Sequence, residues 1–488
     1  MPTRRGILLS DSWSNLCRKE VDSPWSWIVC CCATIIVGLF FGMTLNFGIL
    51  FPVLMNYFQE TRERTGKFKK CFSFTAWVGS VGIACIFALG PVTSMLVNRF
   101  GCRRTALTGA ITCIASLLLS SLPSSIALMY VTYSIPFGFG SSCLFVSSYV
   151  VISLYFDKRK AIATGIVASG TGTGVLVVAP LLQALLDNYD WRKTYRIMAG
   201  IFSVVCLLCL TFDPAVLKRK VKETEQDGEG ETENLAVNHA KNDGKEEIQK
   251  KWLNFSIFKE KTFVVLTLAY TVAFLGQHAP RLHLVKFAED LGISADSASR
   301  LFIYIGITTF ISRLLSGILC NMRCVNSFYV FMFGFILDGS SVIFLSQAKN
   351  YGHLIVFSFL YGLADGFVIG TFNILILYCV EPSKRASAFG VSALFYGITT
   401  ATGPPLAGFM ADRLNTYVPS FILCAVVEFL AAALLFVIIC GKETSRSRWP
   451  IDCNQGDSQL CEVEDNNEGV TNGQHSKVGL PGETAEKE

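Results

Sequence analysis

Long apolar runs are the feature that most constrains this sequence. A helix needs about 20 residues to cross a hydrocarbon core of about 30 Å. No backbone polar group can stay unpaired in lipid, so apolar runs of this length predict transmembrane helices. Twelve such runs lie at 27–51, 73–97, 105–122, 126–155, 161–186, 195–213, 262–286, 300–321, 326–346, 353–379, 387–410 and 418–440.

The composition agrees with lipid as the main solvent. Hydrophobic residues make up 51% of the 488 residues and charged residues 16%, against about 25% charged in typical soluble domains. The 18 cysteines are scattered and form neither a disulfide framework nor a paired zinc-binding pattern. We expect no metal, nucleotide or prosthetic group, and no nucleic-acid partner.

The runs divide the chain into two halves. Residues 214–261 are charged, rich in Gly, Asn and Glu, and nearly free of large apolar residues, so we predict a disordered linker. The tail at 441–488 has the same character. The predicted order is a tail at 1–26, six spans at 27–213, the linker, six spans at 262–440 and the second tail.

The basic loops predict the orientation. Positive charges gather in "NRFGCRR", "FDKRK", "SKR", the start of the linker and the segment after the last span. Cytoplasmic loops carry such an excess of Lys and Arg. The basic segment 61–70 opposes this pattern, but the other loops together outweigh it. We therefore predict that both termini and the linker are cytoplasmic.

Six spans, a linker and six spans resemble the major facilitator superfamily. The segment "GPVTSMLVNRFGCRR" between spans two and three is similar to that superfamily's loop motif, with Asn98 where Asp is usual. The resemblance implies a tightly turned basic loop that holds neighbouring helices in one conformational state. Its retained residues are Arg99, Gly101, Arg103 and Arg104.

Further segments resemble the monocarboxylate transporters. The chain reads "DSPWSW" before span one, "YFDKRKAIATG" between spans four and five, and "GPPLAGFMADRLNTY" in span eleven. Pro24 and the neighbouring serines depart from the family pattern. We interpret the two Trp residues as structural, at the membrane interface. The matching signature residues are Asp22, Trp25, Trp27, Tyr155, Phe156, Lys158, Arg159 and Gly165.

Charged residues inside the spans are costly in lipid, so by default they face a cavity or a partner. Arg313 lies near the centre of span eight. The family resemblance implies that this Arg binds the substrate carboxylate. A guanidinium suits that task because its planar fork matches a carboxylate and stays charged. The alternative is a structural Arg paired with a neighbouring acid.

Asp365 is a second central charge, in span ten. Spans eight and ten run in the same direction, and each residue lies about 12–13 positions from its outer end, or about 18–20 Å. We therefore predict that Arg313 and Asp365 share one polar cavity and interact. Asp338 and Glu428 lie in spans nine and twelve, which are peripheral in this superfamily, so we interpret them as structural or near an interface.

Two departures bear on proton coupling. Proton-coupled members carry an Asp one helical turn before the Arg, where this chain has Thr309, and a Lys in span one, where ungapped counting gives Leu45, beside Asn46. His278, in span seven, is a candidate for the outer vestibule, although a satisfied interfacial His is the commoner case. The candidate substrate-binding residues are Arg313, Asp365, Thr309, Asn46 and His278.

These observations predict an all-α membrane protein with twelve transmembrane helices and the major facilitator fold. Its two six-helix halves should enclose a midplane site with alternating access. The expected function is secondary transport of a small organic anion or zwitterion with a carboxylate across the plasma membrane, weakly or not coupled to protons. Proton-coupled monocarboxylate symport is the first alternative.

A non-transporting membrane sensor or scaffold is the alternative from another class, and Arg313 argues against it. An enzyme is not expected, because no nucleophile, base and orienting group cluster at one membrane depth. The resemblance also implies that some members need a single-span immunoglobulin-type glycoprotein to reach the cell surface. The sequence leaves open whether this chain does.

Overall fold

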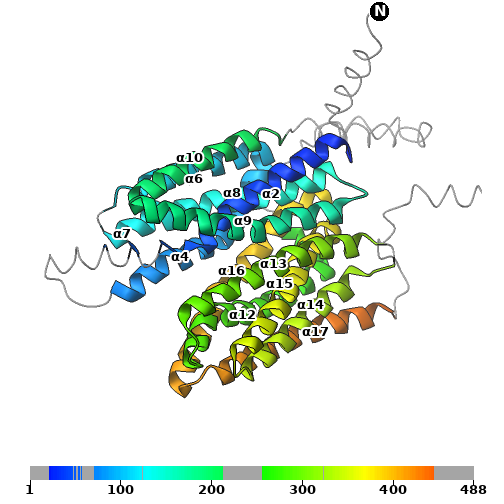
Figure 1. Ribbon diagram of the computed structural model, residues 1–488. Helices are drawn as coiled ribbons and strands as arrows, with labels where there is room; N and C mark the ends of the chain where they lie inside the picture. Colours follow the sequence, from blue (N-terminus) through cyan, green and yellow to red (C-terminus); the bar gives the residue numbers. More distant parts are fainter. Residues whose placement is uncertain are drawn as a thin grey trace, which may run out of the picture. The chain divides into compact units, whose positions relative to one another are not determined.

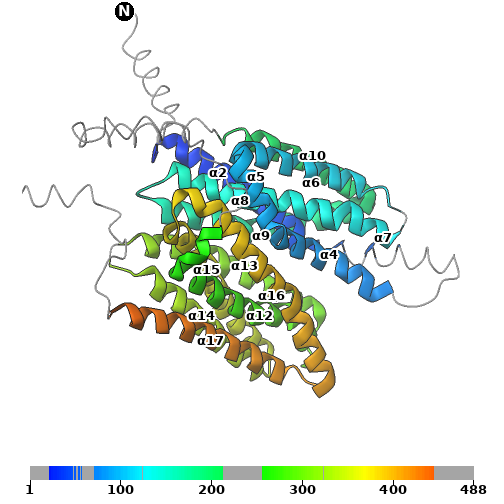
Figure 2. The same ribbon diagram turned by 180° about the vertical axis from the view of Figure 1, so that it is seen from behind.

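The computed structural model describes residues 21–47, 49–50, 53–54, 57, 71–123, 125–212, 255–322 and 324–443. They fall within one compact unit, Met1–Arg446. Across these ranges every regular element is a helix. Figures 1 and 2 show the helices packed as two bundles, one from each half of the sequence.

The helices of the N-terminal half are α2 (Pro24–Leu45), α4 (Cys71–Ala88), α5 (Gly90–Phe100), α6 (Cys102–Leu119), α7 (Ile126–Met129), η1 (Tyr130–Ser134), α8 (Ile135–Tyr155), α9 (Lys160–Asn188) and α10 (Trp191–Cys209). Those of the C-terminal half are η2 (Phe255–Lys259), α12 (Lys261–Asp290), α13 (Ala295–Asn321), α14 (Ser327–Ser346), α15 (Tyr351–Cys379), η3 (Pro382–Lys384), α16 (Arg385–Leu414) and α17 (Val418–Glu443).

Each of the twelve predicted apolar runs falls on one of these helices or on a helical series. Nine helices in the described ranges are long and apolar enough to cross a membrane, and the pair α4 and α5, bent by 44°, makes a tenth. The helix α10 is long enough but carries three basic residues among its first six, and α16 is rich in small and hydroxyl side chains. The expected all-α membrane fold is confirmed.

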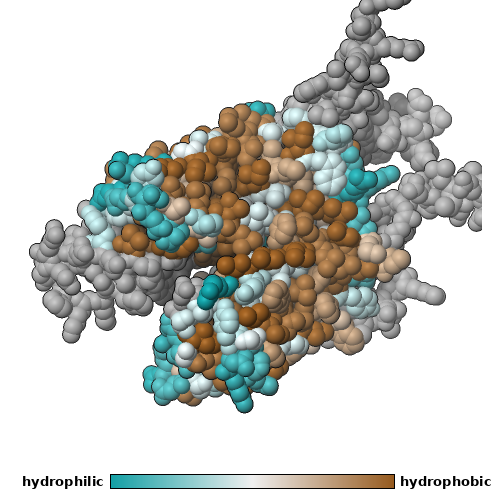
Figure 3. Space-filling view, viewed as in Figure 1, coloured by the Kyte–Doolittle hydropathy of each residue, from teal (hydrophilic) through white to brown (hydrophobic). Residues whose placement is uncertain are grey.

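Apolar side chains cover the outside of both bundles. Figure 3 shows hydrophobic residues across the visible face and hydrophilic residues towards the helix ends. Leu207, Leu282 and Phe409 are 65%, 67% and 59% exposed. Surface of this kind is too extensive for water and is suited to lipid.

The predicted linker, 214–261, lies mostly outside the described residues. Its last residues, however, form η2 and the first position of α12, and Ile257 is fully buried. The folded C-terminal half therefore begins at least as early as Phe255, and the predicted boundary at 261 is seven residues too late. The predicted tails, 1–26 and 441–488, are described only at 21–26 and 441–443.

Small residues let the helices approach closely. In α9, Gly170 and Gly174 pack on α2: a Cβ on Gly42 would lie 2.6 Å from the carbonyl oxygen of Gly174. On another face of α9, a Cβ on Gly165 would lie 2.8 Å from the carbonyl oxygen of Arg313. Backbone contact of this kind is typical of helix packing in membranes, and it joins α9 to both halves of the molecule.

The two halves also meet along α5 and where α8 ends and α9 and α16 begin, a contact region that we call the closed end. There Asn98 Nδ2 donates to Ser387 Oγ at 3.1 Å, and Arg385 Nη1 donates to the carbonyl oxygen of Ser153 at 3.2 Å. A Cβ on Gly90 would lie 2.6 Å from the carbonyl oxygen of Gly390. The closed end thus depends on two facing glycines and two polar contacts.

We expect Gly390→Ala to loosen the closed end, because its added Cβ would overlap the Gly90 carbonyl oxygen and a nearby Ser94 side chain. Overpacking of this kind costs about 1–3 kcal/mol. Hydrogen–deuterium exchange should become faster in α5 and at the start of α16. Gly200→Ala is the matched control, since nothing lies within 4 Å of a Cβ there. Unchanged exchange in the Gly390 variant would contradict the expectation.

Candidate functional site

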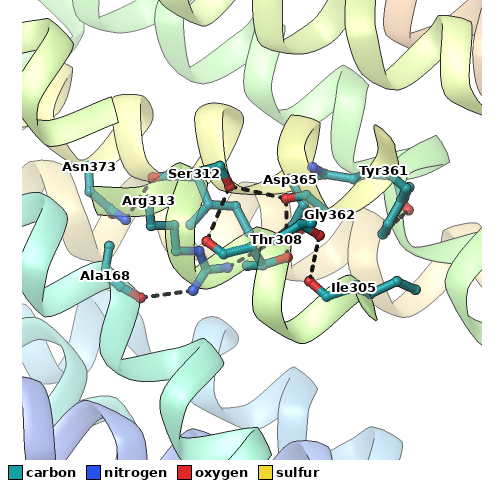
Figure 4. Close-up of polar contacts among 12 residues, drawn as sticks. Ala168, Ile305, Thr308, Ser312, Arg313, Tyr361, Gly362, Asp365 and Asn373 are labelled. Atoms are coloured by element: carbon teal, nitrogen blue, oxygen red, sulfur yellow. Dashed lines mark hydrogen bonds and ion pairs between the residues drawn. The ribbon is translucent and has the colours of Figure 1, made fainter. Parts of the chain in front are cut away.

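Arg313 and Asp365 form an ion pair in the middle of the C-terminal half. Arg313 Nη2 lies 3.1 Å from Asp365 Oδ2, and the two side chains are only 5% and 2% exposed. Arg313 comes from α13 and Asp365 from α15, as Figure 4 shows. The predicted proximity of the two residues is confirmed.

Arg313 also reaches the other half. Its Nη1 donates to the carbonyl oxygen of Ala168 in α9 at 2.9 Å, and Figure 4 shows the guanidinium between Ala168 and Asp365. Its Nε is buried and has no partner among the described residues. The guanidinium therefore bridges the two halves, and its Nε–H is not used by either contact.

Glycines on α15 bring it close enough to α13 to hold the pair. Gly362, Gly366 and Gly370 face Thr308, Ser312 and Ser316, with the spacing that places residues on one helix face. A Cβ on Gly366 would overlap the side chain of Ser312. Ser312 Oγ in turn donates to the Gly362 carbonyl oxygen at 3.1 Å. This close packing fixes the position of Asp365 relative to Arg313.

A cluster of aromatic rings interacts with the ion pair through Tyr270. Tyr270 stacks on Phe372 with ring centroids 3.5 Å apart, and Tyr396 lies 5.2 Å from Tyr270 and 5.3 Å from Phe274. Tyr270 interacts electrostatically with both Asp365 and Arg313. Sequence reasoning missed these rings, because an aromatic residue in an apolar span has no pattern that separates a site from a core.

The N-terminal half adds Tyr149 from α8. Its hydroxyl is 3.4 Å from Asn373 Nδ2 and its ring stacks on Phe389 at 5.5 Å. Tyr149 is buried and also interacts electrostatically with Arg313. The polar centre therefore has contributions from α8, α9, α13 and α15, and so from both halves.

The other three predicted substrate-binding residues differ in position. Thr309 is buried, and its hydroxyl donates to the Gly362 carbonyl oxygen at 3.2 Å. Asn46 donates to the Val175 carbonyl oxygen at 3.0 Å. Val175 lies seven residues beyond Ala168, or about 10 Å along α9. Asn46 is thus at another level from Arg313, and the structure does not bring the two together.

His278 sits in the second half of α12, with its ring 4.9 Å from Phe274. It interacts electrostatically with Asp365, Arg281 and Arg313. Its solvent exposure is intermediate. Its predicted place in the outer vestibule stays a prediction.

Asp338 and Glu428 lie inside the C-terminal bundle. Both side chains are fully buried, Asp338 near the middle of α14 and Glu428 well inside α17. Both oxygens of each carboxyl group lack a hydrogen-bond partner among the described residues. Of the two alternatives, a structural role or a place near an interface, this burial fits the structural role.

The signature residues fasten the start of α2 to the loop before α9. Asp22 Oδ2 accepts the backbone N–H groups of Asp157 and Lys158 at 3.2 and 3.1 Å, and its own N–H donates to the Tyr155 carbonyl oxygen at 3.0 Å. Asp22 adopts a left-handed conformation with φ of 57°. Trp27 packs edge-on against Phe156 at 5.0 Å.

The remaining signature residues lie nearby. Lys158 and Arg159 are exposed, Trp25 packs on the core, and Gly165 contacts α13 beside Arg313. The motif thus sets the position of α9, whose Ala168 carbonyl oxygen meets the guanidinium. The signature residues therefore influence the site indirectly, through the position of α9.

The predicted conformational loop joins α5 to α6 at the closed end. Gly101 has φ of 83°, a conformation that L side chains rarely adopt. Arg99 lies over the Phe100 ring at 5.5 Å, while Arg103 and Arg104 occupy the first turn of α6. Asn98, which replaces the usual Asp, makes the contact to Ser387 described above.

The described residues contain no group of three or more His, Cys, Asp and Glu side chains arranged to hold a metal ion. The site's polar groups are one ion pair, hydroxyl groups, an amide and an imidazole. Such a set can bind an organic ion through charge and hydrogen bonds, but it offers no nucleophile with an adjacent base.

Comparison with known proteins identifies the family. The model of the Major Facilitator Superfamily matches residues 30–396 and 348–452. Monocarboxylate transporter 10 of Mus musculus is 30% identical over 418 residues, covering 86% of this chain and 79% of that protein. The chain belongs to the monocarboxylate transporter family. Monocarboxylate transporter 4 of Gallus gallus is 29% identical, covering 88% and 86%.

Solved structures show the same fold. The human organic anion transporter MFSD10 (TETRAN) matches with a TM-score of 0.65 at 12% identity, covering 84% of this chain and 99% of that one. The proton:xylose symporter XylE matches with a TM-score of 0.68 at 14% identity, covering 85% and 96%. The protein is therefore a multi-pass secondary transporter of the major facilitator type and not an enzyme.

Proposed function

We propose that this member of the family carries a small carboxylate-bearing zwitterion or organic anion across the plasma membrane by alternating access. Arg313 binds the carboxylate and Asp365 faces its cationic group where it has one. The transport is weakly coupled to protons or uncoupled. The observation that carries the proposal is the buried Arg313–Asp365 pair, at a point where both halves contribute.

The balance of charges favours a zwitterion. A substrate carboxylate that binds Arg313 competes with Asp365 for the same guanidinium. Leaving a buried charge unpaired costs about 3–5 kcal/mol. A zwitterion supplies a carboxylate for Arg313 and a cationic group for Asp365, so neither buried charge is left unpaired. A simple anion lacks that group and leaves Asp365 unpaired.

Proton-coupled transport of a simple anion is the second candidate. The same contact favours it, because a proton on Asp365 would neutralise the carboxylate that the anion displaces from Arg313. The family's usual groups for this step are absent, with Thr309 and Leu45 at the corresponding positions. Asp365 would have to carry the proton itself.

Two observations support alternating access. Arg313 donates to Ala168 in the other half, so a substrate that takes over the guanidinium also changes the contact between the halves. The closed end depends on a few polar contacts and two facing glycines, and such contacts can separate without unfolding a helix. The two halves can then rock about the central site.

For the plasma membrane orientation, we expect both termini and the linker to be cytoplasmic, as the basic loops indicate. An epitope tag at residue 235 should be inaccessible to antibody on intact cells and accessible after permeabilisation. A tag between residues 61 and 70 is the matched control and should be labelled on intact cells. Labelling of the tag at 235 without permeabilisation would show that the orientation is the opposite one.

The need for a glycoprotein partner is a separate proposal. Surface biotinylation of cells with and without a co-expressed partner tests it.

Uptake of a labelled panel tests the function. Cells expressing the protein should take up zwitterions with one carboxylate, such as aromatic amino acids or creatine- and carnitine-like compounds, in preference to lactate and pyruvate. Mock-transfected cells are the control. Preference for lactate would exclude the zwitterion and favour the proton-coupled candidate. No uptake of any compound by protein at the cell surface would favour a sensor or scaffold.

A further inference from the structure

The C-terminal half contains a second pair of buried acidic residues that the proposed transport site does not use. Asp338 on α14 and Glu428 on α17 are both fully buried. Their helices pack closely, since a Cβ on Gly339 would lie 3.2 Å from the Ala425 carbonyl oxygen and 3.1 Å from the Phe429 ring. The two carboxyl groups interact electrostatically with each other.

Four carboxyl oxygens in this pair lack hydrogen-bond donors within the described residues. Two nearby hydroxyl groups, those of Tyr361 and Ser341, donate to main-chain carbonyl oxygens. Tyr361 donates to the Gln277 carbonyl oxygen at 2.7 Å, and Ser341 donates to the main-chain carbonyl oxygen of Asp338 at 2.8 Å. The Gln277 amide, on the adjoining α12, is also buried without a partner in that part of the chain.

No cationic side chain in the described ranges pairs with either acid. Arg313, the central cation, is engaged with Asp365, which adds a further negative charge near Asp338. Arg281 on α12 interacts electrostatically with Tyr361 and His278. Two further ionisable groups face the pair, the Cys424 thiol on α17 and the Tyr361 hydroxyl on α15. Two carboxylates without a cation in this interior would each cost several kcal/mol.

We propose that Asp338 and Glu428 form a proton-binding carboxyl pair, whose bound protons keep α14 packed on α17. A protonated carboxyl group gains the donor that these oxygens otherwise lack, and it removes the charge that burial penalises. When Asp338 and Glu428 are protonated they carry no charge, whereas Arg313 and Asp365 remain a charged pair. Only the consequence for substrate binding rests on the proposed function.

That consequence follows from the sign of the charge. Ionisation of Asp338 would add a negative charge near Asp365, which opposes the binding of a substrate carboxylate at Arg313 but favours a cationic group at Asp365. Loss of the protons at alkaline pH should therefore loosen the contact between α14 and α17 and weaken the binding of simple anions more than that of zwitterions. The pair acts as a proton site that sets the pH range of the transporter, and its protons are not moved with the substrate.

Infrared spectroscopy of the full chain in lipid vesicles tests the proton site without any substrate. Protonated carboxyl groups give a carbonyl stretching band, separate from that of carboxylates, which shifts in D₂O. The wild type should show this band at neutral pH and lose it at alkaline pH, and Asp338→Asn/Glu428→Gln should lack it. Asp290→Asn is the matched control, because Asp290 is an exposed carboxylate paired with Lys286 at 3.2 Å.

Thermal unfolding gives a second measurement. A folded state that binds more protons than the unfolded state loses stability as the pH rises. The Tm of the wild type should fall progressively as the pH rises above about 4, the ordinary pKa of a carboxyl group, and the double variant should lose that fall. If the double variant does not fold, the same measurement is made on the single variants Asp338→Asn and Glu428→Gln.

Two outcomes would overturn the proposal. A carbonyl band equal to that of the wild type in each folded variant would show that the protons lie elsewhere. A Tm that rises with added sodium in the wild type but not in the variants would show that the pair binds a metal cation instead. Neither outcome bears on Arg313, so failure of this proposal is separable from failure of the proposed transport function.

Discussion

Arg313→Lys is expected to lower uptake of the transported substrate by about 10- to 100-fold, with little change in the amount of protein at the cell surface. Lysine keeps the positive charge but cannot bond Asp365 and Ala168 at once with a planar fork. A hydrogen bond to a charged group contributes about 1.5–3 kcal/mol, and about 1.4 kcal/mol is a factor of ten in binding.

The measurement is initial uptake of the best compound from the panel, divided by surface protein from biotinylation. Arg300→Lys is the matched control, because Arg300 lies on the same helix, is exposed and donates to Ser297 one turn away. It should keep wild-type uptake. Normal uptake by the Arg313→Lys variant would show that the Arg is structural here or that charge alone suffices.

The ion pair itself could be predicted from the sequence for a simple reason. Arg313 and Asp365 are rare charges inside apolar runs, and the helical rise places them at one depth. Neither argument requires knowledge of which helices touch. The prediction is therefore confirmed, and the structure adds the distance and the burial.

Contacts that depend on backbone atoms could not be predicted in this way. The Ala168 carbonyl oxygen has no sequence signal, because every residue in α9 has one. In the sequence, Tyr270 and Tyr396 cannot be distinguished from other aromatic residues of an apolar span, although their rings lie together in the structure. Only the packing of α9 on α13, through glycines such as Gly165, decides which backbone atoms meet the guanidinium.

The directions of two other side chains could not be predicted. Counting from Trp27 along one helix placed Asn46 among the candidates, and its hydrogen bond to Val175 lies at another level of α9. The peripheral span of Asp338 left a structural role and a place near an interface open, and its side chain is buried inside the bundle. Position along a helix does not give the direction of a side chain, which depends on the neighbouring helices.

The last prediction is that uptake changes little between external pH values of about 6 and about 7.5. A symporter with a fixed cation needs an acceptor that becomes neutral in step with substrate binding. Thr309 cannot ionise and Leu45 offers no ammonium. A zwitterion restores both charges of the Arg313–Asp365 pair, so no proton is required.

Uptake of the best compound is measured at both pH values while cytosolic pH is recorded with a fluorescent indicator. A several-fold stimulation at the lower pH, with matching cytosolic acidification, would contradict uncoupled transport. Asp365→Asn then locates the coupling, because it removes the carboxylate that is paired with Arg313. If that variant transports a simple anion without acidification, Asp365 carries the proton. If it loses only zwitterions, the carboxylate faces the substrate's cationic group, as the buried ion pair leads us to expect.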